Sequence, residues 1–412
     1  MSSEVRDRAV EGTATTAEMV APDFAVLDTL RFVGAMAVLT THVTFYSGDY
    51  TRHGVLGTLL ARLDVGVAVF FVLSGFLLSR PYLARAALGL PRPSTGHYLL
   101  KRLLRIYPVY VVAVVAALTL LEENQDTDLR EWVVTLLLAN TFVDPHLPAG
   151  LSQMWSLGVE ASFYLVLPLI VLAATGVRRL RVWRVLLVLA AMSAVTVWWH
   201  LEAVARIAPE AVGSPQQWLP GYLTWFAVGI AIATVHVEAT RGRVGRAGRA
   251  MLQLGRQPGA CWALAGALML VAATPVAGPV LLAPVAAAES LTKNLLYAAV
   301  GGLLVLSGVF AEPGGRFARW FGAPLARHLG RTSYSVFCLH LLLIDLIMAK
   351  TDWQLFGGHG VQLWLLTVLT SLLAAEVTYR LVERPALRLK RFFPTRSGAA
   401  LTSAATTGTS IR

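Results

Sequence analysis

An arginine and a histidine share one apolar stretch near the N-terminus. The stretch LDTLRFVGAMAVLTTHV, residues 27–43, carries Asp28, Arg31 and His42. A charged side chain near a bilayer centre costs roughly 2.5 to 3.5 kcal/mol, and such residues usually mark a substrate or ion pathway. In a helix, a separation of eleven residues corresponds to about three turns plus 20° and to a rise of about 16 Å, so Arg31 and His42 lie on one face. The pair indicates a pathway along that face; the structural alternative is a satisfied buried ion and an interfacial histidine.

A carboxylate is expected at a depth comparable to that of His42. It belongs to Glu160, in the segment QMWSLGVEASFYLVLPL, residues 153–169. A carboxylate at such a depth must be neutral, paired or in contact with water. We expect Glu160 either to orient the imidazole of His42 and stabilise its protonated form, or to act as a structural hydrogen-bonding partner.

Two arginines are spaced to share a helix face at the start of the third span. Arg102 and Arg105, in KRLLRIYP at 101–108, are three residues apart. Guanidinium groups match the geometry of phosphate oxygens, so the pair could bind phosphates. The alternative is a topology signal that contacts lipid headgroups.

Three further groups lie in apolar helices or at the end of one. Ser74 and Gly75 interrupt a Phe-rich segment, where small residues permit close helix packing; a nucleophilic role for Ser74 is the alternative. His340 ends GRTSYSVFCLH, residues 330–340, and is predicted to face the bundle interior. Glu383 lies at the end of the last span, where a helix-terminal role is expected.

The elements that must position these residues are membrane helices. The chain has 412 residues, 56% of them hydrophobic and 14% charged, which predicts an all-α, polytopic membrane bundle. The segment 132–142 is short and has polar flanks, so we expect an interfacial or re-entrant helix there. Ten spans are predicted, near residues 24–46, 63–80, 107–121, 155–175, 184–200, 217–236, 259–275, 294–311, 327–349 and 361–381.

The distribution of charge orients the predicted bundle. Of the 35 Lys and Arg residues, 28 fall in the termini and in alternate loops, and six fall in the opposite set. The positive-inside rule therefore places both termini in the cytoplasm. This placement explains the net charge of +11 without a nucleic-acid partner. Residues 1–23 and 392–412 are predicted to be disordered tails, and residues 24–391 a membrane domain with no appended soluble domain.

Cysteine usage and the N-terminus add two smaller expectations. Cys261 and Cys338 lie in apolar segments and are interpreted as small buried hydrophobes, not as a disulfide or metal motif. No cleavable signal peptide is recognised, so the first span is expected to direct insertion.

Six motifs in order resemble the membrane acyltransferase family 3, integral O-acyltransferases that modify cell-surface glycans, lipids and some antibiotics. They are LDTLR followed by His42, FFVLSGF at 70–76, RLLRIYP at 102–108, WSLGVEASFYLVLP at 155–168, SYSVFCLH at 333–340 and VERP at 382–385.

The resemblance implies transfer of an acyl group, most simply acetyl, from cytoplasmic acyl-CoA to a hydroxyl of a cell-envelope glycan, glycolipid or small glycosylated metabolite. It implies His42 as general base and Glu160 as the residue that positions it. A covalent acyl-His or acyl-Ser intermediate remains open. Substrate binding is expected of Asp28, Arg31, Ser74, Arg102, Arg105, Trp155, Tyr164 and His340.

The implied enzyme is a multi-pass protein of the plasma membrane, in contact with lipids. We expect no permanently bound cofactor and no metal, with acyl-CoA as a donor substrate. A proton-coupled secondary transporter is the alternative function, although no two halves with matching interrupted helices are recognised. A structural scaffold or lipid-binding protein is a third possibility, which leaves Arg31 and His42 unexplained.

Overall fold

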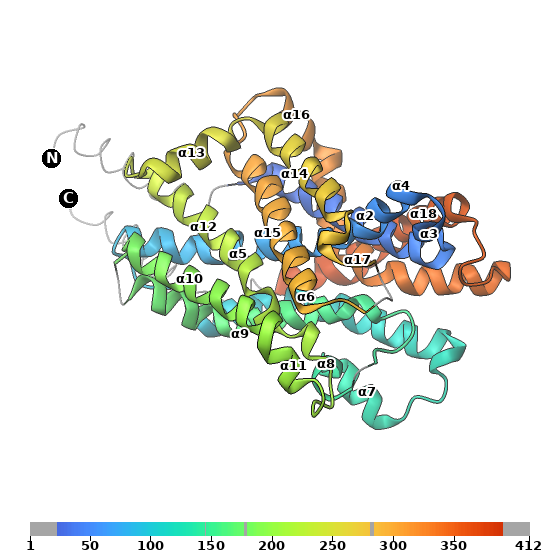
Figure 1. Cartoon of the computed structure of the whole chain (residues 1–412). Helices are drawn as coiled ribbons and strands as arrows, with labels where there is room; N and C mark the ends of the chain where they lie inside the picture. Colours follow the sequence, from blue (N-terminus) through green and yellow to red (C-terminus); the bar gives the residue numbers. More distant parts are fainter. Residues whose placement is uncertain (1–22, 145, 177–178, 281–283, 390–412) are drawn as a thin grey trace, which may run out of the picture.

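The computed structural model describes residues 23–144, 146–176, 179–280 and 284–389, and over these ranges the chain forms helices and no strand. The predicted tails fall outside these residues, apart from Asp23. Nine helical segments in the described chain are long and apolar enough to cross a membrane, which confirms the predicted all-α, polytopic class. Their main helices, packed side by side in Figure 1, are α2 (Ala25–Ser47), α5 (Gly66–Ala87), α6 (Thr95–Leu120), α9 (Trp155–Thr175), α10 (Val182–Trp198), α12 (Leu223–Thr240), α15 (Ala287–Phe310), α17 (Pro324–Thr351) and α18 (Gly360–Thr378).

The predicted tenth span is present as a shorter apolar helix, α14 (Pro258–Ala272). Before its start, Gly255 packs against Phe310 at the end of α15. At its other end, the Nε of Arg62, from the turn that precedes α5, donates to the carbonyl of Ala272 at 2.9 Å. Helix α14 therefore runs antiparallel to α15 and joins the two ends of the bundle.

The remaining helices are short. The segment 132–142 contributes to α7 (Leu129–Leu136) and α8 (Asn140–Val143), neither of which is long enough to span a bilayer. The expectation that this segment does not cross as a full span is confirmed. The other short α-helices are α3 (Asp49–Arg52), α4 (Gly54–Ala61), α11 (Val204–Ile207), α13 (Arg246–Gly255), α16 (Arg316–Phe321) and α19 (Arg384–Arg388). Short 3-10 turns and the π-helical turns η4 (Trp199–Ala203) and η8 (Tyr379–Glu383) complete the described helices.

The two ends of the bundle differ in charge. At one end α2 and α17 begin and α18 finishes, and Arg327 pairs with Asp23 at 3.0 Å while His328 lies 2.7 Å from Glu376. We call this the basic end, because most of the Lys and Arg clusters flank the helices there. The opposite end carries the loop 122–153 with its carboxylates, and we call it the acidic end. Figure 1 shows α13 at the basic end, on the left, and α3, α4 and α7 towards the right.

Glycines bring α5 into close contact with α12. A Cβ on Gly75 would lie 2.3 Å from the carbonyl oxygen of Phe226, and one on Gly229 would lie 2.1 Å from that of Val72. The side chain of Phe226 stacks between Phe71 and Phe163, with ring centroids 4.7 and 3.8 Å away. The predicted packing role of Gly75 is confirmed, and this contact fixes the face of α5 that carries Ser74.

Replacing Gly75 with alanine is expected to destabilise the protein. The added methyl group meets backbone atoms of α12 that cannot move independently, and such overpacking typically costs about 1–3 kcal/mol. The melting temperature of the purified Gly75→Ala protein should fall. Gly266→Ala is the matched control, since that glycine lies in α14 with open space around it. Equal melting temperatures in the two variants would contradict this account of the α5–α12 contact.

Candidate active site

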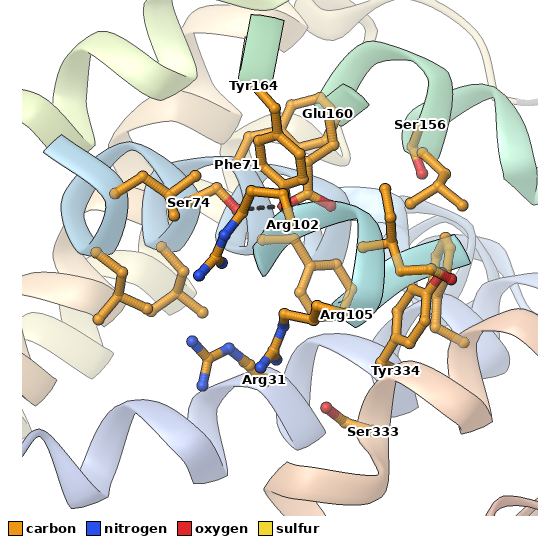
Figure 2. A pocket seen from close by; sticks show the side chains of 17 residues that line it. Arg31, Phe71, Ser74, Arg102, Arg105, Ser156, Glu160, Tyr164, Ser333 and Tyr334 are labelled. Atoms are coloured by element: carbon orange, nitrogen blue, oxygen red, sulfur yellow. Dashed lines mark hydrogen bonds between the residues drawn. The ribbon is translucent and has the colours of Figure 1, made fainter. Parts of the chain in front are cut away.

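A cavity of about 80 Å³ lies among α2, α5, α6, α9 and α17, towards the basic end. A single water needs roughly 10–15 Å³, so the cavity has room for several waters or for a small reacting group. Apolar side chains, among them Phe70, Leu77 and Phe337, form part of its wall. Its polar lining, drawn in Figure 2, comprises Arg31, Ser74, Arg102, Arg105, Ser156, Glu160, Tyr164, Ser333 and Tyr334.

Three guanidinium groups point into this cavity. Figure 2 shows Arg31 from α2 facing Arg102 and Arg105, which lie on successive turns of α6. Asp28 offsets part of this charge, because its Oδ1 accepts from Arg31 at 2.7 Å. The Nε of Arg102 is buried and has no hydrogen-bond partner among the described residues. A buried donor without a partner costs about 1–3 kcal/mol, so the cavity favours an anionic ligand with several acceptor oxygens.

Glu160 is the carboxylate of this cavity. Its Oε1 accepts hydrogen bonds from the hydroxyl of Tyr164 at 2.7 Å and from that of Ser74, the bond drawn as a dashed line in Figure 2. The expected contact between Glu160 and His42 is not formed, so Glu160 does not orient that imidazole. Instead it provides the base beside Ser74 that a nucleophilic serine would require.

His42 is paired with the buried His340. The Nδ1 of His42 lies 2.9 Å from the Nε2 of His340, and the rings are stacked with centroids 5.1 Å apart. His340 is fully buried, which confirms that it faces the bundle interior, while His42 is half-buried.

The hydrogen bonds of His340 assign the tautomers of the neutral pair. The Nδ1 of His340 lies 2.8 Å from the carbonyl of Phe337 and 3.2 Å from that of Val336. Carbonyl oxygens only accept, so Nδ1 carries the proton and Nε2 carries the lone pair. His42 then donates through Nδ1 to that lone pair. Its own Nε2 is left as an acceptor, the form required of a general base.

The histidine pair lies just beyond the cavity. Phe337 lines the cavity, and His340 follows it by one turn on α17. The ring of Phe337 packs edge-to-face on Phe70 with centroids 5.7 Å apart. These two rings therefore lie between the arginines and the histidines.

The parallel packing of α2 and α17 holds both groups of residues together. The carbonyl of Asp28 approaches Gly330 so closely that a Cβ there would lie 2.1 Å from it. The sequence-predicted residues thus separate into two adjacent clusters on these helices and their neighbours. Arg31, Ser74, Arg102, Arg105, Glu160 and Tyr164 line the cavity, Asp28 holds Arg31, and His42 and His340 form the pair beyond it.

Three observations differ from the sequence expectations or extend them. Trp155 lines a different cavity at the acidic end. Tyr334 lines the arginine cavity and donates to the carbonyl of Ile106 at 2.7 Å; its place in the SYSVFCLH motif was the available signal. Glu383 is the last residue of η8, a helix-terminal position, but it is only 2% exposed and accepts from the hydroxyl of Ser335 at 3.3 Å.

Comparison with known proteins matches most of the chain to an acyltransferase family and to two relatives. Residues 24–379 match a family described as an acyltransferase domain. Acyltransferase MdmB of Streptomyces mycarofaciens is 26% identical, covering 87% of this chain and 90% of that protein. Nodulation protein 10 of Rhizobium leguminosarum bv. viciae is 24% identical, covering 88% and 93%. No solved structure matches the chain.

Proposed function

The chain belongs to the family of membrane acyltransferases that its acyltransferase domain defines, and on this premise we propose that it transfers an acetyl group from acetyl-CoA to a hydroxyl of a cell-envelope glycan, glycolipid or small glycosylated metabolite. The observation that carries the proposal is the arrangement of Arg31, Arg102 and Arg105 around a cavity whose far wall adjoins the His42–His340 pair.

The arginines support an acyl-CoA donor. Coenzyme A carries a diphosphate and a further phosphate, which guanidinium groups bind through paired hydrogen bonds. The diphosphate would lie among the arginines that line the cavity, with the nucleoside towards the basic end and the pantetheine arm directed to the histidine pair. The positive-inside rule orients that end to the cytoplasm of a cell bounded by the plasma membrane.

The histidine pair supports direct transfer. The Nε2 of His42 accepts the proton of the acceptor hydroxyl as its oxygen attacks the thioester carbonyl. Collapse of the tetrahedral intermediate breaks the carbon–sulfur bond, and the coenzyme thiolate leaves and takes the proton from His42. His340 holds His42 in the required tautomer, through a hydrogen bond of 2.9 Å. Along α2, Arg31 and His42 are separated by about 16 Å, a distance that the extended arm of an acyl-CoA would bridge past Phe70 and Phe337.

The test is a transfer assay with purified protein in lipid nanodiscs. We expect labelled acetyl-CoA to bind, and its label to pass to a hydroxylated component when a lipid and glycan extract of the source organism is added. A protein that binds no acetyl-CoA would contradict the proposal. Substrate uptake by protein-containing vesicles without any acyl donor would support the alternative, a proton-coupled transporter.

The pairing of His340 predicts a difference between two substitutions. His340→Gln keeps an acceptor near the position of Nε2, whereas His340→Leu removes it and frees His42 to adopt the wrong tautomer. General base catalysis contributes 10²–10⁴-fold, so we expect His340→Leu to lower kcat by roughly tenfold to a hundredfold. His340→Gln should restore much of that loss, with KM for acetyl-CoA unchanged in both. Equal kcat values in the two variants would show that the bond to His42 has no positioning role.

The position of Ser74 separates direct transfer from an acyl-serine route. Its hydroxyl bonds Glu160, the arrangement that a nucleophile would need. With His42 as general base for direct transfer, Ser74→Ala is expected to change kcat by less than about tenfold. Intact-mass spectrometry of the enzyme mixed with acetyl-CoA should show no acetylated protein. An acetyl group trapped on Ser74 would establish the covalent route instead.

A further inference from the structure

A second cavity, of about 150 Å³, opens at the acidic end of the bundle. Its wall comes from the starts of α5, α9 and α12 and the residues just before α5 and α12, from the first three turns of α15, and from the π-helical turn η4. The lining residues are Asp64, Val67, Trp155, His200, Tyr222, Trp225, Ser290, Lys293, Asn294 and Tyr297. We call it the outer cavity.

The outer cavity contains an ion pair close to its opening. The Nζ of Lys293 lies 2.6 Å from Oδ2 of Asp64, and the hydroxyl of Tyr297 donates to Oδ1 of the same carboxylate. The side chains of Lys293 and Asp64 are 31% and 35% exposed, so they reach the opening of the cavity. An ammonium has three donors and a carboxylate has about four acceptor sites. The ion pair has no net charge, and its remaining donors and acceptors can therefore bind an uncharged polar ligand.

Asn294 provides an acceptor that has no partner. The residue is 4% exposed, and its Nδ2 donates to the carbonyl of Gly221 at 2.9 Å. Its Oδ1 is buried and accepts no hydrogen bond from any described residue. Asn294 lines the cavity, and buried polar atoms are normally paired, so a ligand hydroxyl that reached this oxygen would supply its missing donor.

His200 and Ser290 add a second polar position. The Nε2 of His200 lies 3.2 Å from the carbonyl of Gly221, so it carries a proton and donates there. In the neutral ring Nδ1 then accepts from the hydroxyl of Ser290 at 3.0 Å. The lone pairs of the Ser290 oxygen remain available to a ligand hydroxyl.

Aromatic rings supply the apolar part of the wall. Tyr222 lies between Trp155 and Trp225, with centroids 5.1 and 4.9 Å away. The Nε1 of Trp225 already donates to the carbonyl of Asn294 at 2.8 Å. Trp225 therefore contributes its ring surface, not a free donor.

We propose that the outer cavity binds one sugar ring of the acceptor. A pyranose combines apolar C–H faces, which match the aromatic rings, with hydroxyl groups that both donate and accept. The site offers a convergent set of acceptors and donors in a mainly apolar wall, as small-molecule sites do. No unpaired charge in the lining selects an ion. The inference rests on the proposed function only in identifying this sugar as part of the acceptor.

The position of the outer cavity suits that role. Trp155 lines the outer cavity, and the next residues of α9, Ser156 and Leu157, line the arginine cavity. Two residues before Trp155, the Nε2 of Gln153 donates to the carbonyl of Cys338 at 3.0 Å, on the turn of α17 that carries His340. The acceptor sugar and the acyl-CoA donor would thus approach from opposite sides of the first turn of α9.

The test measures binding of methyl α-D-glucopyranoside and methyl α-L-rhamnopyranoside to the protein in nanodiscs, by saturation-transfer NMR. We expect saturable binding of at least one glycoside. Loss of a hydrogen bond to a charged group should weaken that binding about tenfold in Lys293→Met. Asn294→Leu is the second variant, so that the test does not depend on one substitution. Lys350→Met is the matched control, since Lys350 is an exposed lysine at the end of α17.

The outcomes separate this inference from the proposed function. Acetyl-CoA binding is measured on the same samples and should be unchanged in Lys293→Met and Asn294→Leu. No saturable binding of either glycoside, or equal binding by the wild type and both cavity variants, would overturn the sugar site even if acetyl transfer is observed. Glycoside binding that is lost in the variants would support the site even if acetyl-CoA does not bind.

Discussion

His42→Ala is expected to lower acetyl transfer by about 10²–10⁴-fold, the usual contribution of a general base. The Nε2 of His42 is the acceptor left by the hydrogen bond to His340, and alanine removes it. The KM for acetyl-CoA should stay within a few-fold, because the phosphate-binding arginines are untouched. The rate of label transfer at saturating acetyl-CoA measures the effect.

The matched control for this substitution is His146→Ala, since the His146 side chain is 89% exposed in the acidic-end loop. It should transfer acetyl at the wild-type rate. Full activity of a folded His42→Ala protein would show that His42 takes no part in the chemical step. Activity lost together with the melting transition would show a structural role instead.

Removing Arg102 and Arg105 together is expected to weaken acetyl-CoA binding at least a hundredfold. Hydrogen bonds to charged groups contribute about 1.5–3 kcal/mol each, and two such losses exceed the roughly 2.8 kcal/mol that corresponds to this factor. The effect should appear in the dissociation constant of acetyl-CoA, by equilibrium binding to protein in nanodiscs. Binding of the wild type should also weaken as salt is raised.

The control double variant is Arg246→Ala with Arg249→Ala. These residues have the same spacing on α13 and are exposed near the basic end, so they test a general effect of surface charge. Unchanged acetyl-CoA affinity in the Arg102→Ala, Arg105→Ala protein would indicate that this pair is a topology signal that contacts lipid headgroups and does not bind the donor. Equal losses in both double variants would point to non-specific attraction.

Local periodicity predicted the parts of the site that lie on one helix. Arg31 and His42 share a face of α2, and Arg102 and Arg105 share a face of α6, because the spacing of a helix fixes such relations. The partner of His42 could not be predicted from helix spacing. His340 lies 298 residues away in sequence, and only the parallel packing of α2 on α17 brings the rings together.

The depth of Glu160 was misjudged for a physical reason. The sequence predicts that α9 starts near the membrane surface. In the structure, Gln153 already bonds the carbonyl of Cys338, beside His340, before α9 begins. Glu160 lies seven residues further on, about 10 Å deeper by helix geometry. It therefore reaches the arginine cavity, and Trp155 takes the position towards the acidic end.

The fold shows the same division between local and long-range information. Apolar length predicted the spans well, because a bilayer sets that length. Helix α14 is shorter than the length criterion, yet it joins the two ends of the bundle through contacts with α15 and Arg62. The outer cavity could not be predicted, since its residues come from five segments that meet only after folding.

Mass spectrometry of envelope lipids, glycans and glycosylated metabolites tests the central claim most directly. The samples come from the source organism, from a deletion strain, and from that strain complemented with wild-type protein or with His42→Ala. We predict that one hydroxylated species loses an acetyl-sized mass on deletion and regains it with the wild type but not with His42→Ala. Identical spectra in all four strains, or restoration by His42→Ala, would contradict the account.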